Sequence, residues 1–129
     1  MKKVLVICTT LFLILMFSTP TIASNQSTCE DALLSLMWED IRKAIVEHHC
    51  DIKDIQSSDE KVLDLKMTNG LSFEITIQLD AFVGAHNTIG TDTLKFVREV
   101  PDGLKLVSYK HTPSKDKKEI LEWYFKNRS

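Results

Sequence analysis

The chain has 129 residues, of which 43% are hydrophobic and 26% are charged, and its formal net charge is −2. The length is too small for two domains, and the apolar content is too high for a disordered chain. Without Lys2 and Lys3, 14 of the 16 basic residues remain against 18 acidic ones, a net charge of −4. A small acidic domain matches nucleic acid and anionic membrane surfaces poorly, so both classes of partner are disfavoured.

The first residues have the pattern of a secretory signal peptide. Two lysines form a short positive region, residues 4–17 are uncharged and almost wholly apolar, and small residues surround Ala23. The apolar run is too short to span a bilayer comfortably. We therefore predict a signal peptide over residues 1–23 and one small exported domain over residues 24–129, secreted and without a membrane span once the signal is removed.

A long amphipathic helix is expected at the start of this domain. Thr28 can cap a helix whose first turn is acidic, and apolar side chains recur at three- and four-residue steps from Leu34 to His48. The charged residues between them fall mainly on the other side, which leaves one apolar face. Residues 51–60 are polar and are expected to connect this helix to the next element.

The sequence period then changes to two, which predicts a four-stranded antiparallel meander. The expected strands cover residues 63–67, 71–79, 93–100 and 104–111, and a Pro-Asp-Gly turn joins the last two. A sheet with one apolar face needs a cover, and the amphipathic helix can supply it.

The first hairpin contains Asn69-Gly70, a strong turn signal. A two-residue loop would place apolar side chains opposite charged ones, although directly opposed residues share one face of a sheet. We therefore expect a three-residue loop with Gly70 in the left-handed conformation, which pairs Met67 with Leu71 and Leu65 with Phe73.

The last element is expected to be a short helix that Ser114 can cap, although residues 119–125 are also apolar enough for an edge strand. The predicted fold class is α+β: an N-terminal amphipathic helix packed on a four-stranded antiparallel meander, followed by a short C-terminal helix. Cystatin and nuclear-transport-factor-like folds have a broadly similar architecture, and the comparison concerns architecture only.

Cys29 and Cys50 are a disulfide candidate, because paired cysteines in an exported protein are usually bonded. They bracket the predicted helix, however, and 21 residues at about 1.5 Å each would separate them by roughly 30 Å. A disulfide needs α-carbons within about 7 Å, so an intrachain bond requires a broken or shorter helix. Free thiols and a bond to another chain are the alternatives.

No recognised catalytic motif occurs in the sequence, so we assign no catalytic residue, no cofactor and no enzymatic activity. Residues 48–51, His-His-Cys-Asp, contain the residue types of a zinc site. Neighbouring helical side chains point about 100° apart, and a further ligand would have to come from His86 or His111. We therefore assign no metal ligands.

Residues 82–92 are expected to form a long connection between the second and third strands, because two glycines and an asparagine adopt positive φ readily. Loops rich in donors and acceptors often carry function. The alternative is a structural loop whose side chains satisfy its own backbone. The candidate binding residues are Gly84, His86, Asn87, Thr88, Gly90 and Asp92.

The predicted helix, the alternating strand after it and the Gly84–Asp92 string together resemble a family of short exported proteins from spore-forming Gram-positive bacteria. That family is classified only as a domain of unknown function. The resemblance covers roughly Cys29 to Tyr109, and Ala85 and Glu39 stand where the family often has proline. It implies export and one small domain, and it implies no activity.

Three hypotheses about function follow from the sequence. The first is a non-enzymatic module that binds an unknown protein or cell-surface partner through residues 84–92. The second is a cystatin-like protease inhibitor with Phe82-Val83-Gly84 as its wedge. The third is a small hydrolase or metal-binding protein that uses His86 and Asp92.

Overall fold

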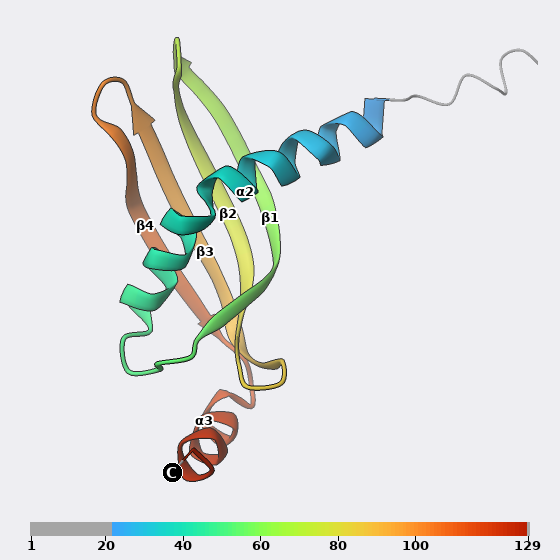
Figure 1. The fold of residues 1–129 in the computed structure, drawn as a ribbon, viewed down its shortest axis with the longest axis vertical. Helices are drawn as coiled ribbons and strands as arrows, with labels where there is room; N and C mark the ends of the chain where they lie inside the picture. The colour runs from blue at the N-terminus through green and yellow to red at the C-terminus, as the bar shows by residue number, and fades with distance from the viewer. Residues whose placement is uncertain (1–21, 129) are drawn as a thin grey trace, which may run out of the picture. The chain divides into compact units, whose positions relative to one another are not determined.

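The computed structural model describes residues 22–128, drawn in Figure 1. The predicted signal peptide over residues 1–23 falls outside them except for its last two positions, and it stays a prediction. No helix within the described part of the chain is long and apolar enough to cross a membrane. The chain divides into two compact units, residues 1–32 and 33–129, and the sheet, the core and the sites described below belong to the second.

The first described element is helix α2, Ile22–His48. It begins six residues before the expected cap at Thr28, because residues 22–27 contain neither proline nor glycine to end a helix. The predicted apolar face is confirmed: the buried side chains of α2 follow the expected three- and four-residue spacing, and they are Met37, Ile41, Ala44 and Ile45.

Four antiparallel strands follow in the sheet order β1-β2-β3-β4, which confirms the predicted meander and the α+β class. The strands are β1 (Gln56–Asn69), β2 (Ser72–Val83), β3 (Asn87–Glu99) and β4 (Gly103–Pro113), all longer than expected. The part of α2 after residue 32 lies across one face of the sheet (Figure 1). Alternate residues of the central strands fill the core beneath it, among them Ile75, Ile77, Leu79, Leu94 and Phe96.

The predicted register of the first hairpin is wrong by two residues. Met67 pairs with Phe73 and Leu65 with Ile75, with an irregularity between Met67 and Asn69. The turn therefore falls at Gly70 and Leu71, and Gly70 has the expected left-handed backbone at φ 57°. A two-residue shift keeps Leu65 and Met67 on the predicted face, opposite Ile75 and Phe73, although both side chains are exposed. The irregularity between Val62 and Asp64 turns Val62, rather than the expected Leu63, toward the core.

The long connection expected over residues 82–92 is also wrong. Strand β2 continues to Val83 and β3 begins at Asn87, so the turn consists of residues 84–86. Gly90, expected to provide loop flexibility, lies inside β3. A Cβ atom at this position would stand 2.5 Å from Cε1 of His111 on β4, so glycine is needed for close packing rather than for a loop.

The last element is helix α3, Lys117–Lys126, which confirms the helix over the edge strand. Its N-cap is Asp116, which makes no side-chain cap bond, and Ser114 instead donates its hydroxyl to the carbonyl of Thr88. Tyr124 is buried and its hydroxyl donates to Asp54 Oδ2 at 3.2 Å, which attaches α3 to the segment before β1.

Replacement of Gly90 by alanine should lower the free energy of unfolding by about 2 kcal/mol, because the added methyl group overlaps the backbone carbonyl of Thr112 and the ring of His111. Urea denaturation measures this change. Ser108→Ala at an exposed position of β4 is the matched control and should change the free energy by less than about 0.5 kcal/mol. Equal effects of the two substitutions would contradict the close packing at Gly90.

Candidate functional site

Among residues 22–128, several polar side chains gather around the carboxylate of Asp92, which is fully buried. Asp92 points inward because it shares the alternation of Leu94 and Phe96 on β3. The β3–β4 register places His111 directly opposite Asp92 and Tyr109 opposite Leu94. We call the side chains that meet here the Asp92 cluster: His49, Asp92, Tyr109, His111 and Lys117.

Three donors converge on the two carboxylate oxygens. His49 Nε2 lies 2.9 Å from Oδ2, the Tyr109 hydroxyl donates to the same oxygen at 2.5 Å, and His111 Nδ1 lies 2.5 Å from Oδ1. His49 follows the last residue of α2, so one acidic side chain joins the end of that helix to two strands. The described residues contain no buried side-chain polar atom without a partner.

Lys117 determines which nitrogen of His111 carries the proton. Its Nζ lies 2.9 Å from His111 Nε2, and an ammonium group can only donate. Nε2 is therefore the acceptor, and Nδ1–H donates to Asp92. The result is a directed chain of hydrogen bonds from the first residue of α3, through His111, to the buried carboxylate.

Electrostatics keeps this carboxylate ionised. Burial raises the pKa of Asp92, but the hydrogen bonds from its three donors lower it by more, so the pKa lies below its ordinary value of 3.8. Burial, followed by the bond to Asp92 and its negative charge, raises the pKa of Tyr109 well above its usual range. Tyr109 therefore remains a neutral donor to an ionised acceptor.

His48 covers the solvent side of Tyr109. The two rings stack with centroids 3.9 Å apart and planes inclined by 11°, and His48 itself is exposed. Burial in this stack, with the neighbouring charge of His49, lowers the pKa of His48. The apolar spacing of the helix ends at His48, but the structure exposes His48 and buries His49 instead.

The structure separates the six residues proposed as a binding loop. Asp92 and Gly90 are buried in β3, Asn87 opens that strand, and only Gly84 and His86 belong to the turn. His86 has φ 61° and its ring stacks on Phe82 with centroids 4.6 Å apart, so it is not a partner of Asp92. Thr88 is exposed on β3.

This geometry removes the basis of two sequence hypotheses. A hydrolase or metal site made by His86 and Asp92 requires a contact that the structure does not provide, because the partners of Asp92 are His49, Tyr109 and His111. A cystatin-like wedge requires exposed apolar side chains, and both Phe82 and Val83 are buried.

The two cysteines of the described chain are both exposed free thiols. Helix α2 is continuous from Ile22 to His48, so the break that a Cys29–Cys50 bond would require is absent from the described residues. The Cys50 thiol lies 4.0 Å from Asp51 Oδ1 and does not belong to the Asp92 cluster.

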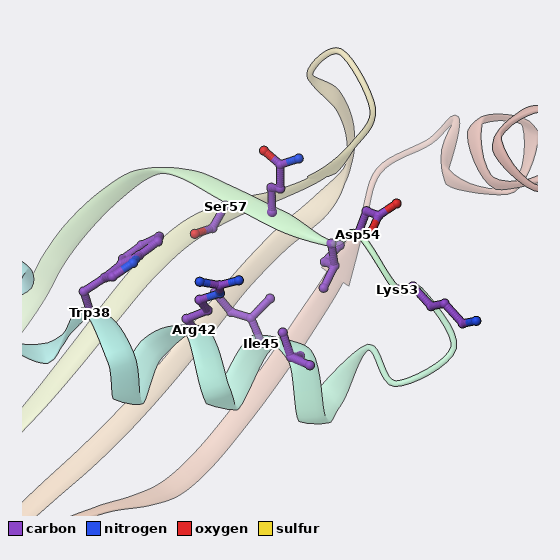
Figure 2. Close-up of a pocket in the computed structure, with 9 residues that line it drawn as sticks. Trp38, Arg42, Ile45, Lys53, Asp54 and Ser57 are labelled. Atoms are coloured by element: carbon purple, nitrogen blue, oxygen red, sulfur yellow. The ribbon is translucent and has the colours of Figure 1, made fainter. Parts of the chain in front are cut away.

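A surface pocket of about 460 Å³ lies between α2 and the beginning of β1. Figure 2 shows Trp38 and Arg42 extending from α2 toward Ser57 on β1, with Lys53 and Asp54 in the connection at one end. We call it the Trp38 pocket. Its lining residues are Trp38, Arg42, Ile45, Val46, Lys53, Asp54, Ile55, Gln56 and Ser57.

The protein is a small α+β domain in which an amphipathic helix covers one face of a four-stranded meander. It contains a buried histidine–aspartate cluster and a surface pocket. The chain belongs to the DUF3888 family, described as proteins of unknown function, whose family model matches residues 29–113. This match confirms the predicted resemblance to a domain of unknown function. No curated protein and no solved structure matches the chain.

Replacement of Asp92 by asparagine should lower the free energy of unfolding at pH 7 by about 3 kcal/mol, because it leaves buried donors without an ionised acceptor. A carboxyl group whose pKa is lower in the folded than in the unfolded state stabilises the fold at pH values above its unfolded-state pKa. This stabilisation is lost as the pH falls toward the folded-state pKa. The difference between wild type and Asp92→Asn should therefore shrink below pH 3.8.

Chemical denaturation across this pH range, in the presence of a chelator, measures both effects. Asp80→Asn is the matched control, since Asp80 accepts a single bond, from Thr91 at 3.0 Å, and is only partly buried. A loss for Asp92→Asn no greater than that of the control would show that the carboxylate does not hold these elements together.

Proposed function

We propose that the protein is a non-enzymatic exported module that binds an extended, acidic peptide segment of a protein partner in the Trp38 pocket. One observation carries the proposal: the pocket combines an exposed tryptophan and two cationic side chains with the edge strand of the sheet. Export rests on the signal-peptide pattern of the first residues, and the absence of a recognised catalytic motif favours binding over catalysis.

The edge of the sheet supplies backbone hydrogen-bonding groups. Strand β1 is outermost and pairs only with β2, so its other side has no strand partner among residues 22–128. An extended peptide can add to such an edge. The pocket borders the start of β1, where residues 56–58 pair regularly with β2 before the first irregularity, so a peptide in the pocket lies beside a short regular edge.

The apolar part of the pocket can hold one side chain of the peptide. Trp38 is 39% exposed at its mouth, while Ile45 and Ile55 are buried at its base. Exposed tryptophans beside apolar recesses are frequent centres of binding energy in protein interfaces. Since only a few backbone bonds are available at the start of β1, this anchor provides most of the affinity.

Charge selects an acidic peptide. Arg42 and Lys53 are exposed and form no ion pair with any residue of the described chain, so both are available to a ligand. The one acidic residue of the pocket, Asp54, is paired with Arg128 and accepts from Tyr124. The pocket therefore presents net positive charge within a chain that is acidic overall.

A phage library of random peptides, panned against the purified protein, tests this proposal. We expect selected peptides to share an apolar residue next to acidic ones, and their binding to quench the fluorescence of Trp38. Trp38→Ala should weaken binding by roughly thirtyfold, the loss typical of an interface anchor.

Two control variants locate the effect. Trp123→Phe alters the other tryptophan, which is 58% exposed on α3, and should preserve binding. Arg42→Glu should weaken binding of acidic peptides, whereas Arg98→Glu at an exposed position of β3 should not. Selection of peptides without a common pattern, or equal binding by wild type and Trp38→Ala, would exclude the proposed site.

A further inference from the structure

We propose that His49, Asp92 and His111 bind a divalent transition-metal ion, Zn²⁺ or Cu²⁺, inside the domain. One ligand atom from each residue lies within 4.8 Å of the other two. The three come from different parts of the fold: the residue after α2, the middle of β3 and the end of β4. This inference is independent of the peptide pocket.

The separations between the ligand atoms suit a small ion after a modest adjustment. Bonds of about 2.0–2.1 Å in a tetrahedral site place neighbouring ligand atoms roughly 3.3 Å apart. His49 Nε2 is now 2.9 Å and His111 Nδ1 2.5 Å from the nearer Asp92 oxygen. Both separations need to widen by less than about 1 Å, which small side-chain rotations provide.

The cluster is buried and its backbone positions are set before any ion enters. The side chains of His49, Asp92 and His111 are 5%, 0% and 10% exposed. Cross-strand pairing fixes Asp92 opposite His111, so the backbone already sets their separation. The Tyr109 hydroxyl holds the Asp92 carboxylate in place from outside the ligand set, as outer hydrogen-bond partners do in metal sites.

The ligand types select the ion. Two imidazole nitrogens and one carboxylate favour zinc or copper, whereas calcium and magnesium prefer sites made of oxygen atoms. Cys50 is exposed and its thiol lies against Asp51 Oδ1, so the thiol is not part of the set. Three protein ligands leave a further coordination position open.

Lys117 occupies the cluster as a resident cation that competes with the ion. An ion bound at Nδ1 of His111 forces the ring proton onto Nε2, and an N–H group cannot accept the bond that Lys117 now donates. Lys117 must then leave. Apart from this hydrogen bond, the position of Lys117 is electrostatically unfavourable for a cation. Lys117 is the first residue of α3, and the helix dipole repels positive charge at that end.

Calorimetric titration of the full, chelator-stripped protein with Zn²⁺ and with Cu²⁺ tests the site. We expect one ion per chain, and binding about tenfold tighter in Lys117→Met because the competing positive charge is gone. Lys118→Met is the matched control, since Lys118 is exposed and paired with Glu122, and its affinity should equal that of wild type. His49→Ala and His111→Ala should abolish binding, while His86→Ala and Cys50→Ser should retain it.

Thermal melts show whether the histidine variants are folded. If they are not, the comparison of metal affinity between Lys117→Met and Lys118→Met tests the site without them. Co²⁺ substitution adds a spectroscopic check: d–d bands without a thiolate charge-transfer band are expected. No binding by wild type and Lys117→Met at micromolar concentration would overturn the proposal. Loss of binding in Cys50→Ser would overturn it too, because the ion would then sit on the surface string at residues 48–51.

Discussion

The buried carboxylate of Asp92 is the constraint on which the arrangement of this domain depends. A buried charge is tolerated only when donors surround it, and here the donors come from the residue after α2 and from β4, with Lys117 of α3 joined through His111. Apolar packing in the core holds α2 against one face of the sheet. The Asp92 cluster determines where the end of the helix and the start of α3 lie on that sheet.

Much of the fold follows from local patterns in the sequence. The three- and four-residue spacing from Leu34 to His48 predicts the packed face of α2, and the two-residue alternation of β2 predicts the inward side of the sheet. The register of the first hairpin is not predictable in this way, because irregularities near Thr68 and between Val62 and Asp64 shift the pairing of β1 with β2.

The site was harder to predict, since its members meet through long-range contacts. Gly90 and Asn87 are residues that favour turns, and this local preference concealed a strand that pairing with β2, and for Gly90 also with β4, imposes. The one usable signal was spacing: Asp92 lies two residues before Leu94 and four before Phe96, on the same inward face. His111 could be assigned to Asp92 only with the β3–β4 register known.

The position of the proton on His111 tests the central account most directly. Long-range nitrogen–proton NMR of the metal-free protein identifies the tautomer of each histidine ring. If Lys117 and Asp92 hold the ring as described, His111 carries its proton on Nδ1 and this proton exchanges slowly with solvent. A proton on Nε2, or rapid exchange at Nδ1, would contradict the directed chain of hydrogen bonds that organises the domain.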